Sequence, residues 1–180
     1  MTSTDQTQLT RRWRQTLQQG REALAQEYRS NRNARQYLIK HGQLVDSTIR
    51  SVWEILGLGQ RAALLAVGGY GRGQLFPHSD IDLLLLLPEA TSHNLSGVVE
   101  NFIGVMWDIG LEVGHSVRTI NECLSEARQD ITVETTLLEN RLLAGNITLY
   151  HQLNQAVEKH RDPVRFLEGK LLEQQQRHNK

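Results

Sequence analysis

The 180-residue sequence contains one cysteine, three prolines and no long apolar segment. One cysteine cannot form an internal disulfide, and no apolar run approaches the roughly 20 residues that a membrane-spanning helix needs. The N-terminus also lacks the apolar core of a signal peptide. Because 20 basic residues balance 20 acidic ones, the surface is not of the strongly basic kind that phosphate backbones select. We therefore expect a cytoplasmic protein that binds neither membranes nor nucleic acids.

The sequence shows no residue pattern typical of a zinc site or of covalent catalysis. The histidines show no spacing typical of a zinc site, and Cys123 is the only cysteine. Cys123 lies on a predicted amphipathic helix, where a small buried thiol is ordinary. No Ser-His-Asp or Cys-His arrangement stands out from spacing. These absences argue against a structural zinc site and against covalent catalysis.

The most informative segment present is GGYGRGQLFPHSDIDLLLLL, residues 68–87. An apolar run predicts a buried strand over Ala62–Val67, the glycines and Pro77 predict a turn, and a second strand is predicted over Ile81–Leu87. Because side chains alternate along a strand, Asp80 and Asp82 should project on the same side, roughly 6 to 7 Å apart. Both carboxylates could then reach one metal cluster, as nucleotidyl transfer with two Mg²⁺ ions requires.

The turn before these acids is suited to phosphate. Gly68 and Gly69 lack a Cβ, so their backbone N–H groups can approach phosphate oxygens, and Ser79 can add a hydroxyl donor. Arg72 is the cation of the turn, and it either pairs with the β- and γ-phosphates or is a solvated loop residue. The turn has neither the GK[ST] ending of a P-loop nor the G-x-G-x-x-G spacing of a dinucleotide-binding fold.

These motifs resemble those of known enzymes. Gly68-Gly69 followed by Ser79-Asp80-Ile81-Asp82 is similar to the signature of the DNA polymerase β-like nucleotidyltransferase superfamily. The fuller string of residues 68–84, with WDIGLEVGHSVRT at 107–119 and LLENRLLAG at 137–145, resembles the N-terminal domain of bacterial PII uridylyltransferase/uridylyl-removing enzymes. The resemblance implies that Gly68 and Gly69 hold the UTP phosphates and that Asp80 and Asp82 bind catalytic Mg²⁺.

The superfamily usually supplies a third carboxylate from a later strand. Glu112, between two apolar residues, has the expected form and is our candidate for the third catalytic and metal-binding residue. Asp108 is the competitor, but it lies at the predicted end of a helix over Leu95–Ile109, where an acid is easily solvated. Arg118 would share a strand face with Glu112 and contact phosphate or ribose.

The activity that the resemblance implies is transfer of UMP from UTP to a tyrosyl hydroxyl of the nitrogen regulatory protein PII, with release of pyrophosphate. Alternatives are a related enzyme with another nucleotide or acceptor, and a regulatory fragment that binds nucleotide without catalysis. Full-length enzymes of the family continue into an HD-type phosphohydrolase domain and paired ACT domains. This sequence contains no His-Asp dipeptide, so uridylyl removal is expected to be absent.

The predicted fold is α+β, with a small mixed-sheet nucleotidyltransferase core flanked by helices. We expect an N-terminal helical hairpin over residues 1–60, the core over 61–120, and a helical extension over 121–180. One predicted helix of that extension spans Val133–Leu143. The terminal segment 167–180 favours a helix and has no stop signal, so we expect the chain to be truncated there.

Overall fold

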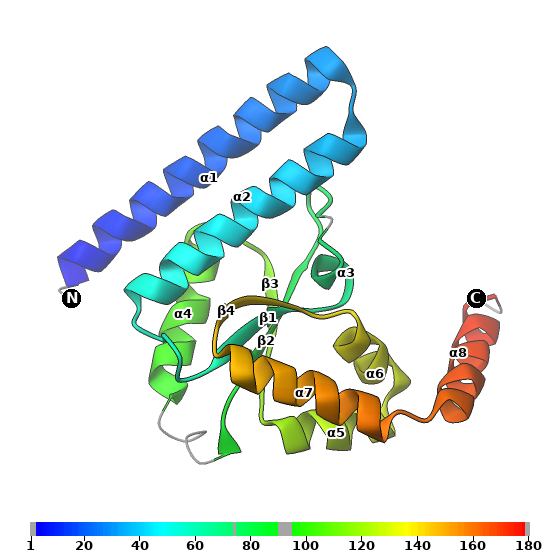
Figure 1. Ribbon diagram of the computed structural model, residues 1–180. Helices are drawn as coiled ribbons and strands as arrows, with labels where there is room; N and C mark the ends of the chain where they lie inside the picture. Colours follow the sequence, from blue (N-terminus) through cyan, green and yellow to red (C-terminus); the bar gives the residue numbers. More distant parts are fainter. Residues whose placement is uncertain (1–2, 74, 90–94, 179–180) are drawn as a thin grey trace.

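The computed structural model describes residues 3–73, 75–89 and 95–178. In that part of the chain, helices cover both faces of a four-stranded sheet (Figure 1). The helices are α1 (Ser3–Asn31), α2 (Ala34–Ile55), α3 (Gly68–Gly71), α4 (Ser96–Asp108), α5 (Ile120–Gln129), α6 (Ile131–Leu138), α7 (Ile147–His160) and α8 (Pro163–His178). The strands are β1 (Ala63–Ala66), β2 (Ile81–Leu86), β3 (Val113–Arg118) and β4 (Arg141–Gly145).

The sheet is mixed, with the strand order β3-β2-β1-β4. β1 pairs antiparallel with both β2 and β4, whereas β2 pairs parallel with β3. The inner strands are nearly continuous apolar runs because both of their faces are covered by helices. The predicted α+β fold with a small mixed sheet is confirmed.

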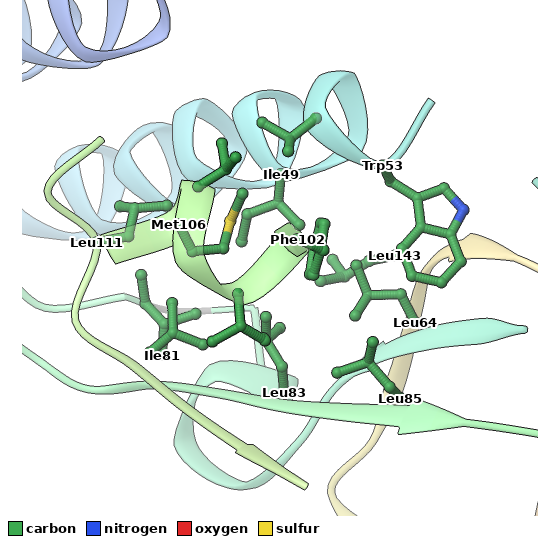
Figure 2. Close-up of a cluster of buried hydrophobic side chains, with 14 of the residues drawn as sticks. Ile49, Trp53, Leu64, Ile81, Leu83, Leu85, Phe102, Met106, Leu111 and Leu143 are labelled. Carbon is green, nitrogen blue, oxygen red and sulfur yellow. The ribbon is translucent and has the colours of Figure 1, made fainter. Parts of the chain in front are cut away.

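A hydrophobic core fills each side of the sheet. In the first core, shown in Figure 2, Leu83 and Leu85 of β2 face α2 and α4, where Trp53 meets Phe102 edge to face at 5.6 Å between ring centroids. The second core joins the alternate residues Leu84 and Leu86 to α5, α6 and α7. By the same alternation, the side chain of Asp82 lies on the side of the second core.

The N-terminal hairpin predicted from the sequence is formed by α1 and α2, which lie side by side in Figure 1. Trp13 and Leu17 of α1 are buried and join the first core. The indole Nε1 of Trp13 donates a hydrogen bond to Ser51 Oγ of α2 at 3.1 Å. The hairpin therefore packs on the sheet through its apolar side.

The helix predicted over Val133–Leu143 is wrong in its second half. α6 ends at Leu138, where the side chain of Asn140 donates a hydrogen bond to the Leu137 carbonyl, and β4 follows. β4 forms because the edge of β1 offers backbone donors and acceptors that need partners, and this long-range pairing overrides a local helical pattern. The division of the chain at residues 60 and 120 stays a prediction.

Over the described ranges, we find no helix with the length and apolar character needed to span a bilayer.

Candidate active site

The parallel pairing of β2 with β3 brings the predicted acids to one end of the sheet. Asp82 lies opposite Gly114, and the Ile81 amide donates a hydrogen bond to the Glu112 carbonyl at 3.0 Å. Asp80 and Glu112 each stand one residue before their strand, so the register places them beside one another. Residues that are partners in a parallel pair share a face, so these acids point the same way.

A cleft of about 550 Å³ opens at this end of the sheet. Asp80, Asp82 and Glu112 all line it, together with Trp107, which is 58% exposed. Asp108, the alternative third acid, lies in a separate cavity against α1, where its backbone carbonyl accepts a hydrogen bond from Arg14. The cleft therefore gathers our three predicted metal-binding residues and leaves Asp108 outside.

The electrostatics of the cleft fit a divalent cation. Burial raises the pKa of Asp82, and the neighbouring charge of Asp80 raises it further. Two carboxylates that repel one another in a partly buried site are stabilised by a hard cation, and carboxylate oxygens are the ligands that Mg²⁺ prefers. Asp80, Asp82 and Glu112 line one cleft but do not converge on a single point, since no three His, Cys, Asp or Glu side chains in the described part of the chain form a ready metal-binding group.

Two glycines enclose the Asp82 carboxylate. A Cβ on Gly68, whose φ is +57°, would lie 3.7 Å from Asp82 Oδ2, and a Cβ on Gly114 would lie 2.7 Å from Oδ1. The Val67 amide also donates a hydrogen bond to the Asp82 carbonyl at 3.1 Å, which ties the end of β1 to β2. Gly68 and Gly69 begin the one-turn helix α3 beside this carboxylate.

The two polar residues predicted to bind phosphate, Arg72 and Ser79, are both exposed. Arg72 forms a 2.6 Å ion pair with Glu139, and its side chain is 60% exposed. The Ser79 amide donates a hydrogen bond to the Phe76 carbonyl, and the residue is exposed. Arg118, the further phosphate or ribose candidate, forms an ion pair with Glu126 of α5. Nucleotide binding by these residues stays a prediction.

A smaller cavity of about 270 Å³ adjoins the cleft on the side of α6. Its polar lining comprises Asp82, His115, Ser116 and Arg118, with Thr132 and Thr136 of α6, and apolar residues at the end of β1, on β2 and on α6 complete its walls. We call it the polar pocket because of the carboxylate and hydroxyl groups that it presents next to the predicted metal site. Sequence reasoning did not include the α6 threonines, because nothing in their spacing connects them to β2.

A buried polar network, also missed from the sequence, holds the glycine turn. Tyr70 of α3 donates its hydroxyl proton to Asp46 Oδ1 at 2.5 Å, and Arg141 of β4 binds both oxygens of Asp46 at 2.6 and 3.0 Å. The Arg141 guanidinium also lies over the Tyr70 ring, 5.2 Å from its centroid. One signal was available, since Asp46 lies among buried residues at helical spacing on α2.

A strand, a glycine turn and a D-x-D strand in a mixed sheet, with acids collected in one cleft, define a nucleotidyltransferase. A family model described as "Nucleotidyltransferase domain" matches residues 49–144, and the chain belongs to this family.

Several curated relatives are similar to this chain over most of its length. The chain is 56% identical over 168 residues to the bifunctional uridylyltransferase/uridylyl-removing enzyme of Chromobacterium violaceum, across 93% of this chain and 20% of that protein. It is 50% identical over 173 residues to the enzyme of the same name from Nitrosospira multiformis, across 93% of this chain and 20% of that protein. It is 43% identical over 180 residues to the enzyme of that name from Cupriavidus metallidurans, across 100% of this chain and 21% of that protein. The chain thus spans about a fifth of the length of these relatives.

Proposed function

We propose that this chain is the nucleotidyltransferase part of a PII uridylyltransferase, which transfers UMP from UTP to a tyrosyl hydroxyl of PII and releases pyrophosphate. The observation that carries the proposal is the cleft that Asp80, Asp82 and Glu112 line together. The names of the similar proteins support uridylyl as the transferred group. A cytoplasmic location is part of the proposal, because UTP is an intracellular substrate.

Asp80, Asp82 and Glu112 are the residues that would hold Mg²⁺. The bound metal would neutralise charge on the triphosphate and lower the pKa of the acceptor hydroxyl. The protein's own contribution is positioning, because the two strands and the enclosing glycines fix where the Asp82 carboxylate lies. The pKa of Asp82 is raised by burial and by Asp80, so a cation in the cleft would stabilise its ionised form.

The nucleotide would occupy the side of the sheet that faces α6. There, Gly68 leaves space for phosphate oxygens beside Asp82, and Gly69 leaves space beside Arg72. The polar pocket with Thr132 and Thr136 can take the nucleoside end. Arg72 would exchange its exposed ion pair with Glu139 for a phosphate, at little cost since exposed pairs are worth about 0–1 kcal/mol. Ser79 would add a hydroxyl donor.

The reaction balances without a covalent intermediate. The tyrosyl oxygen attacks the α-phosphorus in line with the departing group, and a new P–O bond forms. The bond from the α-phosphorus to the oxygen bridging to the β-phosphate breaks, and pyrophosphate leaves. The hydroxyl proton passes to solvent.

Calorimetric titration with UTP, ATP, GTP and CTP, with and without Mg²⁺, tests this proposal. We expect selective binding of UTP that needs Mg²⁺. The double variant Asp80→Asn, Asp82→Asn should bind UTP at least about tenfold more weakly, because charge-assisted contacts are worth about 1.5–3 kcal/mol each. Its fold should persist, since removing two acids that repel one another seldom harms a core.

The matched control is Asp108→Asn, which removes an acid near the cleft but outside it, and it should bind UTP as the wild type does. Transfer of radiolabelled UMP to PII then tests the acceptor. The absence of any nucleotide binding, or global unfolding of the double variant, would contradict the proposal. Preference for another nucleotide would point to a relative with different specificity.

A further inference from the structure

A groove on the opposite side of the sheet from the polar pocket runs along α1 to the candidate active site. Three cavities of about 500, 380 and 390 Å³ adjoin one another there. The first two share Arg14, and the second and third share Arg21, Glu22 and Gly110. The third also shares Gly110 and Glu112 with the cleft of the acids. The groove therefore ends where the predicted chemistry takes place.

The length of this groove suits a polypeptide. Its lining on α1 extends from Gln6 to Ala25, which corresponds to about 28 Å at the rise of an α-helix. That distance accommodates about eight residues of extended chain.

The groove carries a charge that lacks a partner. Arg21 of α1 is half-buried, and no residue of the described chain forms a hydrogen bond or ion pair with its guanidinium. The nearby acid Glu22 accepts a hydrogen bond from Gln18 instead. Burial lowers the pKa of Arg21, so its charge is held at a desolvation cost that an anionic partner would offset.

The walls around Arg21 are apolar and aromatic. Tyr37 stacks on His41 at 5.9 Å between ring centroids, and His41 Nδ1 lies 3.1 Å from the Leu75 carbonyl. Phe76 lines the same cavity with 58% of its surface exposed. Burial lowers the pKa of His41, and Arg21 and His78 lower it further, so little positive charge comes from His41. In this cavity, one half-buried arginine among largely apolar walls fits a peptide with an acidic side chain better than a polyphosphate.

The direction of attack agrees with this location. In nucleotidyl transfer, the attacking and leaving oxygens lie on opposite sides of the phosphorus. The proposed nucleotide lies on the α6 side, and the groove lies on the α1 and α2 side, where Ile81 belongs to the first core. An acceptor hydroxyl that enters from the groove would meet the phosphorus opposite the departing pyrophosphate.

We infer that this groove is the docking site of the acceptor protein, and that Arg21 pairs with a carboxylate in the acceptor segment that carries the tyrosine. The inference rests on the proposed function and adds to it the surface that selects the acceptor.

The test is the affinity of this chain for a purified PII-family protein, measured by calorimetry with Mg²⁺ and a UTP analogue whose α,β bridge cannot be cleaved. Arg21→Glu should weaken acceptor binding at least tenfold, while UTP affinity and the midpoint of thermal unfolding stay unchanged. Arg12→Glu is the control, because it makes the same charge change on an exposed residue of α1 that lines none of these cavities. Added salt should weaken wild-type binding more than Arg21→Glu binding.

Equal acceptor affinity in the wild type and Arg21→Glu would overturn the inference and leave the proposed function intact. Tight UTP binding without any acceptor binding would overturn the inference together with the acceptor named in the proposed function. Failure of the wild type to bind UTP would instead refute the proposed function itself.

Discussion

At the scale of single residues, the position of the Asp82 carboxylate depends on neighbours that lack side chains. Parallel pairing puts Gly114 directly beside Asp82, and a Cβ there would lie 2.7 Å from the Asp82 oxygen. Real Cβ atoms essentially never come that close, so the carboxylate would have to rotate away. The identity of a residue on β3 thus controls where an acid of β2 points.

We therefore predict that Gly114→Ala weakens Mg²⁺-dependent UTP binding at least about tenfold, the loss expected for one charge-assisted contact. Stability should change little, because the obstructing atom is the end of a side chain that can rotate. Calorimetry and thermal unfolding measure both effects. Gly104→Ala in α4, where a Cβ meets open space, is the control and should raise stability by about 0.5–1 kcal/mol. Unchanged UTP affinity in Gly114→Ala would contradict the prediction.

At the scale of elements, three pieces distant in sequence meet at Asp46. α2 contributes the carboxylate, α3 contributes Tyr70, and β4 contributes Arg141, 95 positions away from Asp46. The side chains of Asp46 and Arg141 are only 11% and 27% exposed, so each would be costly to leave unpaired. The network fixes α3, whose first residue, Gly68, adjoins the Asp82 carboxylate.

Tyr70→Phe tests this network and its dependence on pH. Loss of a hydrogen bond to a carboxylate should lower the free energy of unfolding by about 2 kcal/mol. Burial, and then the charge of Asp46, raise the pKa of Tyr70 far above its usual 10.0. As the pH rises, the unfolded chain therefore loses the phenolic proton of Tyr70 before the folded chain does. The contribution of Tyr70 to the free energy of unfolding is complete below pH 10 and falls above it by about 1.4 kcal/mol per pH unit.

Urea unfolding between pH 7 and 11 measures the slope of the free energy of unfolding against pH. In Tyr70→Phe, this slope should lack the part that Tyr70 contributes. The control Tyr28→Phe, on a residue that is 37% exposed, should retain the wild-type slope. Equal slopes in wild type and Tyr70→Phe would show that the hydroxyl is not held as the structure describes.

At the scale of the whole molecule, the sheet is the shared wall of two cores. All buried residues of both clusters precede residue 158. α8 lies beyond them and packs on α6, where Arg165 approaches Glu134 at 3.6 Å, while Leu167 and Leu171 remain at least half exposed. α8 is thus attached to the body of the molecule without contributing to either core.

We predict that deletion of residues 163–180 leaves one cooperative unfolding transition and unchanged UTP affinity. The free energy of unfolding should fall by about 1–2 kcal/mol, because Glu134 loses its ion pair and α6 loses a packing neighbour. Circular dichroism during urea unfolding, with calorimetry, measures this. A molten or aggregated product would show that α8 belongs to the folding unit.

The sequence by itself determined the local elements. Apolar runs predicted β1 and β2, helical spacing predicted α1 and α2, and the GG and D-x-D motifs predicted the family, because each of these signals depends on residues within a few positions of one another. The sequence also proposed Asp80, Asp82 and Glu112 as a set, and their metal-binding roles stay a prediction.

Only the tertiary structure decided which residues distant in the sequence come into contact. Residues 141–145 became a strand because β1 had an unpaired edge, and Asp46 found Tyr70 and Arg141 only when three elements packed together. The groove along α1 arises in the same way, from α1, α2, the segment 75–79, the first residue of β2 and the loop before β3. Such features depend on pairing and burial between distant residues, and periodicity within a short window carries no information about them.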